Sequence, residues 1–227
     1  MASVGPGRLT AGCRATALSA SLLLAGSRGY ARVVCVEVDT IESVELIGGV
    51  EKREIKLVPA DPRWPERFEE ERAKIAAALG TKAIRIDHIG STSIPGIVAK
   101  PIIDIDLSVK DVDDEEDYLP ALIAAGYQLR VRESGHRMVR TVDLGVHVHC
   151  CAAGSGWERR HLLFREWLRR DEADRLAYGE LKMRLAQQDW PDMNAYANAK
   201  SALIEEITAR AQRWAVDSNW TVGSAAC

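Results

Sequence analysis

Two aspartates stand one residue apart in an apolar run, IIDIDL at residues 102–107. Side chains of a β-strand alternate between its two faces, so Asp104 and Asp106 are predicted to share one face, about 6 to 7 Å apart. Two carboxylates at this distance repel each other unless a cation lies between them. Magnesium takes oxygen ligands, often one or two protein carboxylates together with substrate phosphates. The spacing therefore predicts a catalytic Mg²⁺ site formed by Asp104 and Asp106.

A short loop before this strand contains residue types that contact phosphates. Gly90 and Ser91 end an alternating strand pattern, and a glycine there lets backbone N–H groups approach a ligand. Ser91 and Ser93 are candidates for phosphate contact, although lone loop serines usually bond to their own backbone. Lys100 precedes a proline, which holds it extended, and it could neutralise a phosphate. A phosphate loop beside an aspartate pair indicates phosphoryl or nucleotidyl transfer.

Two histidines share one face of a later predicted strand, VHVHCC at residues 146–151. Imidazole accepts a proton near neutral pH and binds transition metals, but it is a poor magnesium ligand. His149 is therefore a candidate base or metal ligand, and His147 a candidate substrate contact. The alternative is that both histidines simply bond to neighbouring polar groups of the sheet.

Two Tyr-x-x-x-Lys pairs lie in the helical C-terminal part of the sequence. Tyr178 and Lys182, like Tyr196 and Lys200, are one helical turn apart, so each ring and ammonium share a face. The two pairs could stack a base and hold phosphate, or the tyrosines could be core residues beside exposed lysines. Arg160 belongs to a basic helix side that is either solvated or the far wall of a phosphate cleft.

The periodicity of the chain predicts the elements that position these residues. Apolar positions alternate through several short segments up to residue 151 and recur at helical spacing from residue 156 to 214. The fold class expected is α/β (α+β), with a mixed sheet of about five strands followed by a C-terminal three-helix block. Strands are expected at residues 54–58, 84–87, 102–107, 127–131, 137–142 and 146–151, and the first helix at about residues 65–79.

The longer string around the aspartates, HIGSTSIPGIVAKPIIDIDL at residues 88–107, closely resembles the GrpB family. Three further segments resemble family positions: PADPRWPERFEEE at residues 59–71, HVH at 147–149 and RRHLLFREWLR at 159–169. The resemblance covers about residues 54 to 213. It implies the nucleotidyltransferase fold of the DNA polymerase beta type.

The resemblance also implies a function, but this chain has histidines where the superfamily usually has a carboxylate. Enzymes of that superfamily bind a nucleoside triphosphate with Mg²⁺ and usually carry a third carboxylate where this chain has a histidine strand. We therefore expect a nucleotidyltransferase acting on an unknown acceptor, with His149 in the third position. The alternative is a non-catalytic accessory protein that binds a nucleotide or a coenzyme A-related ligand, since family members often accompany dephospho-CoA kinase.

The composition of the chain limits the partners and the cellular compartment that we expect. The chain has 227 residues, 47% of them apolar, and a net charge of -3, which argues against general nucleic-acid binding. Its five cysteines are odd in number and lack C-x-x-C spacing, which favours a reducing cytoplasm over a disulfide framework. The longest apolar run near the start is shorter than the about 20 residues that span a membrane, so no membrane association is expected.

The two ends of the chain are expected to lie outside the domain at residues 54–215. Residues 1–36 contain arginines but no acidic residue, a pattern also found in targeting peptides. We expect residues 1–53 to be a disordered extension or the product of a start codon placed too far upstream. Residues 216–227 are expected to be a flexible tail.

Overall fold

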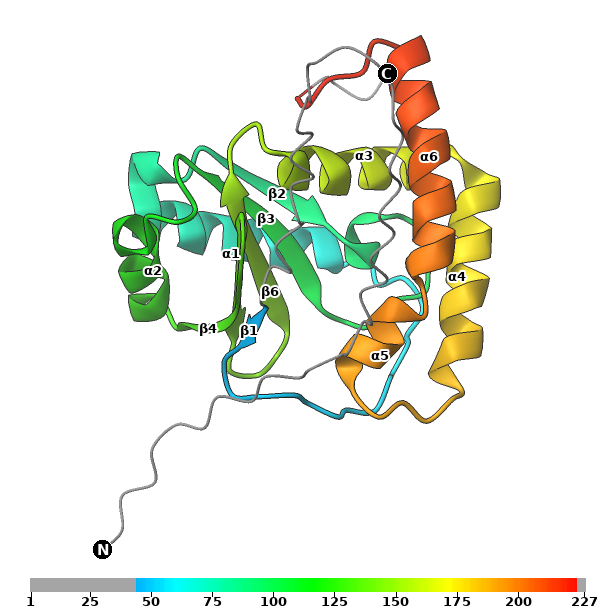
Figure 1. Ribbon diagram of the computed structural model, residues 1–227, viewed down its shortest axis with the longest axis horizontal. Coiled ribbons are helices and arrows are strands. Elements are labelled where there is room, and N and C mark those ends of the chain that lie inside the picture. The colour runs from blue at the N-terminus through cyan, green and yellow to red at the C-terminus, as the bar shows by residue number, and fades with distance from the viewer. Residues whose placement is uncertain (1–43, 224–227) are drawn as a thin grey trace, which may run out of the picture. The chain divides into compact units, whose positions relative to one another are not determined.

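The computed structural model describes residues 44–223, and the expectations for residues 1–43 and 224–227 lie outside this part. Within it the chain forms a mixed sheet with helices on both faces, shown in Figure 1. This confirms the α+β class expected from the sequence. None of the described helices is long and apolar enough to cross a membrane.

The sheet has six strands in the order β1-β4-β5-β6-β3-β2. Strands β3 and β6 run parallel, and every other neighbouring pair is antiparallel. Five strands have five to seven residues, and the sixth, β1, has only two. The strands are β1 (Glu45–Leu46), β2 (Arg85–Ile89), β3 (Ile103–Val109), β4 (Tyr127–Glu133), β5 (His136–Thr141) and β6 (Val146–Ala152).

The helices divide between the two faces of the sheet. Helices α1 and α2 pack on the apolar face, α3 crosses the other, and α4 and α6 pack against α3, as Figure 1 shows. Two 3-10 turns, η1 and η2, flank β2. The helical elements are α1 (Trp64–Leu79), η1 (Gly80–Lys82), η2 (Ser91–Ser93), α2 (Glu115–Ala124), α3 (Gly156–Arg170), α4 (Glu172–Ala186), α5 (Met193–Asn198) and α6 (Ser201–Asp217).

The two faces of β3 explain why this strand is central. Ile103, Ile105 and Leu107 are fully buried on the face that α1 and α2 cover. Burying such a side chain contributes about 1.5–3 kcal/mol, so this face anchors the sheet. Asp104 and Asp106 alternate with these residues and point to the face that α3 crosses.

Two expected elements differ from those observed. Residues 54–58 form no strand of the sheet, and within them only Val58 pairs, with Ala99, in an isolated antiparallel bridge. The expected third C-terminal helix is divided into α5 and α6. The N–H of Lys200 bonds to the carbonyl of Ala197, three residues back, and this tighter turn separates the two helices.

The residues on either side of the expected domain are tied to the fold. β1 pairs with β4, and the Glu51 carboxylate accepts hydrogen bonds of 2.6 and 3.0 Å from Arg140. At the other end α6 continues to Asp217, and the Trp220 ring packs on Trp214. Residues just outside 54–215 therefore contribute contacts of their own.

Candidate functional site

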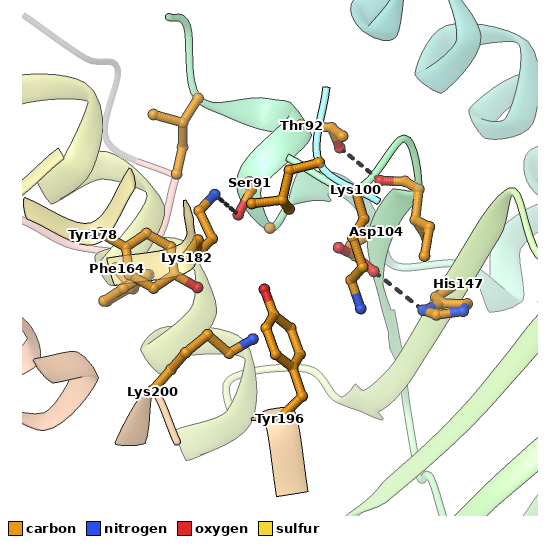
Figure 2. Close-up of a pocket in the computed structure, with 14 residues that line it drawn as sticks. Ser91, Thr92, Lys100, Asp104, His147, Phe164, Tyr178, Lys182, Tyr196 and Lys200 are labelled. Atoms are coloured by element: carbon orange, nitrogen blue, oxygen red, sulfur yellow. Dashed lines mark hydrogen bonds and ion pairs between the residues drawn. The ribbon is translucent and has the colours of Figure 1, made fainter. Parts of the chain in front are cut away.

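A cavity of about 170 Å³ lies beside the loop between β2 and β3. It collects residues from both halves of the chain, and most candidates from the sequence line it. Figure 2 shows the Lys182 and Lys200 ammonium groups and the Tyr178 and Tyr196 hydroxyls pointing into one space. The lining residues are Leu57, Gly90, Ser91, Thr92, Ile94, Lys100, Ile102, Asp104, His147, Phe164, Tyr178, Lys182, Tyr196 and Lys200.

Gly90 allows the loop to pass directly over Asp104. Its φ is 65°, and a Cβ built on it would lie 2.9 Å from the Asp104 Cβ and closer still to a carboxylate oxygen. Only glycine combines this backbone conformation with this contact. The sequence predicts that Gly90 lets the backbone approach a ligand, and this glycine is also needed to leave space for the Asp104 side chain.

Three lysines surround the two tyrosine rings of the cavity. Lys182 is 3% exposed, and its ammonium donates to Ser91 Oγ at 2.9 Å and to the Val98 carbonyl. Lys200 and Lys100 lie over the Tyr196 ring, 4.5 and 5.4 Å from its centroid. Tyrosines and lysines therefore occupy one site. The alternative, in which the tyrosines are core residues beside exposed lysines, does not hold for Lys182, because this lysine is buried.

The cavity holds positive charge with little compensation. Burial lowers the pKa of Lys182 to about 7, with a further lowering by Lys200, and burial lowers the pKa of Lys200 to about 8. Burial likewise lowers the pKa of Lys100, while the charge of Asp104 opposes the shift at all three lysines. Among residues 44–223 none of the three forms a salt bridge. An anion is the ligand that this arrangement would stabilise.

Asp104 faces two histidines from the neighbouring strand. The parallel register pairs Asp104 with His147, and Asp104 Oδ1 lies 3.4 Å from His147 Nδ1 and 3.9 Å from His149 Nε2. Burial alone would raise the pKa of Asp104, but the two imidazoles outweigh it and hold that pKa well below its usual range. Burial would lower the pKa of His149, but Asp104 outweighs it and raises that pKa.

Asp106, the second aspartate of the predicted pair, has a separate partner. It is fully buried, and its two oxygens lie 2.9 and 3.1 Å from Nδ1 of His161 on α3. One donor atom leaves lone pairs on both oxygens of the Asp106 carboxylate, so this contact does not exclude an ion shared with Asp104. The Mg²⁺ site expected from the two aspartates therefore stays a prediction.

A chain of hydrogen bonds runs from β4 to the site through two histidines. His136 Nδ1 lies 2.7 Å from Glu133 Oε1, and His136 Nε2 lies 3.0 Å from His149 Nδ1. The Trp157 ring stacks on His136 with centroids 4.2 Å apart. This chain of hydrogen bonds fixes how the His149 ring is oriented, and spacing along the sequence does not predict it.

Four candidates do not line the cavity: Asp106 and His149, whose contacts are given above, and Ser93 and Arg160. Ser93 Oγ donates to the Gly90 carbonyl at 2.7 Å, which is the loop-stabilising role considered as its alternative. The Arg160 guanidinium lies 4.8 Å from the centroid of the Trp157 ring and does not line the cavity.

Several residues of the site could not be predicted from their spacing in the sequence. Thr92 Oγ1 donates to the Ile102 carbonyl at 3.0 Å and ties the loop to the start of β3. Phe164 and Leu57 contribute apolar walls. His161 has helical spacing with apolar neighbours, which indicated only a packing face.

The chain is similar to several known proteins across most of its length. A UPF0157 protein of Streptomyces coelicolor is 50% identical over 171 residues, covering 75% of this chain and 91% of that protein. A dephospho-CoA kinase of Mycolicibacterium paratuberculosis is 29% identical over 195 residues, covering 73% of this chain and 48% of that protein.

A solved structure and a family description agree with these relatives. The crystal structure of conserved protein GrpB from Enterococcus faecalis has a TM-score of 0.62 and 32% identity, covering 70% of this chain and 99% of that one. The family described as GrpB protein matches residues 54–210. The family resemblance found in the motifs is confirmed, and this chain belongs to the GrpB family.

Proposed function

We propose that the protein binds the phosphates of a nucleoside triphosphate in the lysine cavity and transfers a nucleotidyl group to an unidentified acceptor. The observation that carries this proposal is the convergence of Lys100, Lys182 and Lys200 on one cavity without a salt-bridge partner among residues 44–223. A polyphosphate would supply the missing negative charge.

The size of the cavity indicates which part of a nucleotide it would hold. About 170 Å³ is well below the roughly 300–1,000 Å³ of pockets that enclose a drug-sized ligand. The cavity suits phosphate groups, and the base would lie at its mouth. Tyr178 and Tyr196 then serve as walls beneath the lysines, and Ser91 orients the Lys182 ammonium.

Asp104 lies on the lining of the same cavity and is the carboxylate nearest to the reaction in this proposal. A Mg²⁺ requirement remains part of the proposal in a limited form, because magnesium can bind one protein carboxylate when the phosphates supply other ligands. Asp106 and His161 would act by holding the strand and the helix together beneath the site.

A binding function without turnover is the second candidate. The histidines at the third position favour it, because a two-metal transferase usually has a carboxylate there. Some relatives are named dephospho-CoA kinase, so a phosphate-bearing coenzyme A-related ligand belongs to this alternative.

Thermal unfolding with ATP, GTP, CTP, UTP and dephospho-CoA, each with and without Mg²⁺, tests the binding proposal. At a ligand concentration 100 times the dissociation constant, the stabilisation should be about 2.7 kcal/mol. The double variant K182M/K200M should lose this shift, whereas K56M, which changes an exposed lysine outside the cavity, should keep it.

Release of pyrophosphate separates the two candidate functions. Nucleotide binding with Mg²⁺-dependent pyrophosphate release supports transfer, and binding without release supports the accessory function. If no nucleotide or coenzyme shifts the melting temperature, or if the double variant responds like the parent, the cavity is not a phosphate site and both candidates are rejected.

A further inference from the structure

Four of the five histidines of the chain gather around β6 and α3, and two of them face Asp104. Asp104, His147 and His149 each offer one ligand atom, and these atoms lie within 4.8 Å of one another. We propose that these three residues bind one divalent transition-metal ion, with an open coordination position toward the lysine cavity. This proposal concerns the ion alone and does not depend on nucleotide binding.

The spacing of the donor atoms suits a shared ion better than direct contact. Asp104 Oδ1 lies 3.4 Å from His147 Nδ1 and 3.9 Å from His149 Nε2, and the second distance is too long for a hydrogen bond. Ligands about 2.0–2.1 Å from a tetrahedral zinc are about 3.4 Å apart, so small movements would bring all three onto one ion.

The hydrogen-bond chain through His136 orients the second histidine for this role. When His136 Nδ1–H donates a hydrogen bond to Glu133, His136 Nε2 is left to accept a hydrogen bond from His149 Nδ1–H. In the neutral form of His149, Nε2 then carries a lone pair on the side of the Asp104 carboxylate. Two electron-rich atoms in this arrangement repel each other unless a metal ion or a proton lies between them. Metal-bound histidines commonly have this kind of support from a carboxylate.

One ring nitrogen of His147 lacks a partner among residues 44–223, and the other lies beside Asp104. The His147 Nε2 atom is buried and has no hydrogen-bond partner in the described part of the chain. A buried ring nitrogen without a partner is costly unless the other ring nitrogen gains something in return. Metal binding through Nδ1, on the side of Asp104, would supply that gain.

The donor types determine which ion the site would select. Two imidazoles and one carboxylate suit zinc, iron, cobalt or nickel, whereas magnesium prefers oxygen ligands alone. Three protein ligands also leave a position for water or substrate, as in catalytic zinc sites. That position would face Ser91 and the lysines, because Asp104 and His147 line the same cavity.

Calorimetric titration of untagged, chelator-treated protein with Zn²⁺, Co²⁺, Mn²⁺ or Mg²⁺ alone tests this inference. We expect about one Zn²⁺ per chain with a dissociation constant of about 1 µM or lower, and at least about 100-fold weaker binding of Mg²⁺. D104N and H149A should each weaken Zn²⁺ binding at least about 100-fold. H136Q, which changes a positioning residue, should weaken it about 10- to 100-fold.

H88Q is the matched control, because His88 is a buried histidine bonded to Thr92 outside the cluster. It should bind Zn²⁺ like the parent. X-ray absorption of the zinc-loaded parent provides a measurement that needs no variant, and we expect imidazole nitrogens about 2.0–2.1 Å from the metal.

Three results would overturn the inference. The parent protein could fail to bind any transition metal, which would mean that a proton on His149 alone neutralises the contact with Asp104. Zn²⁺ binding could survive in D104N and H149A, or the absorption spectrum could show no imidazole, and either result would place the metal elsewhere.

Discussion

Replacing Lys182 with methionine should stabilise the protein at low pH and lose part of that advantage as the pH rises. The side chain is 3% exposed, and burial together with repulsion from Lys200 and Lys100 lowers its pKa from 10.5 to about 7. At about 1.4 kcal/mol per pKa unit, the folded protein disfavours the charged form by roughly 5 kcal/mol. Asp104 opposes the shift, and the Tyr178 ring lies under the ammonium.

The direction of the pH dependence follows from the pKa of Lys182 in the folded and unfolded states. Its pKa in the folded state is below the value in the unfolded chain, so between about pH 7 and 10.5 the unfolded chain holds more protons. The stability contributed at Lys182 therefore rises with pH in this window, and below pH 7 the full penalty is present. Methionine binds no proton and lacks this dependence.

The effect of the buried charge on stability can be separated from the effect of the hydrogen bonds that K182M removes. Losing the hydrogen bonds to Ser91 and Val98 costs about 1 kcal/mol each, and these losses are nearly independent of pH. From pH 6 to pH 9 the stability of K182M relative to the parent should fall by about 2–3 kcal/mol. Only this change with pH reports the buried charge.

Urea unfolding of metal-free protein at pH 6, 7, 8 and 9, in buffers without phosphate, measures the difference. Tryptophan fluorescence can follow it, since the chain has six tryptophans. K56M, at an exposed lysine, should differ from the parent by the same amount at every pH. If the difference between K182M and the parent also stays constant from pH 6 to 9, Lys182 is hydrated and the argument for an anion cavity fails.

Three further predictions follow from the same structure. Binding of ATP should weaken as the pH rises above about 7, because Lys182 loses the charge that holds phosphate. The affinity therefore falls with pH while the stability of the parent rises. Isothermal titration at pH 6.5 and 8.5 measures the two affinities, and equal values would contradict the prediction. G90A should lose more stability than G96A by about 1–3 kcal/mol in chemical denaturation, because both glycines have positive φ but only Gly90 contacts Asp104. A chain that begins at residue 50 should still fold, yet melt at a lower temperature than one that begins at residue 44, because the buried Arg130 donates to carbonyls of residues 47 and 49; equal melting temperatures would contradict this.

The period of two along the strands was enough to predict much of the site. It placed Asp104 and Asp106 on one face of their strand and His147 and His149 on one face of another, and the structure has both strands side by side. The Tyr-Lys pairs were located by helical spacing in the same way. Local periodicity determines which side chains share a face, so these relations are visible in the sequence.

Partners that depend on tertiary packing could not be predicted in this way. The sequence suggests that Asp104 and Asp106 share one ion, but β3 passes under α3, and His161 on that helix binds Asp106. Similarly, Glu133 and His136 reach His149 only because β5 pairs with β6. Neither contact follows from spacing along one element.

The lysine cavity and the histidine cluster are two consequences of one arrangement. Burying three ammonium groups together costs stability, and so does leaving His147 Nε2 without a partner. Both groups of residues lie around Asp104, whose charge opposes the lowering of the pKa values of Lys182 and Lys200 and attracts both imidazoles. An anion would relieve the first cost, a metal ion on His147 Nδ1 would offset the second, and a phosphate oxygen on the open metal position would connect the two sites. Sites where unrelieved costs concentrate are those where a fold holds groups ready for a ligand, so the region around Asp104 is where the function of this chain should be sought.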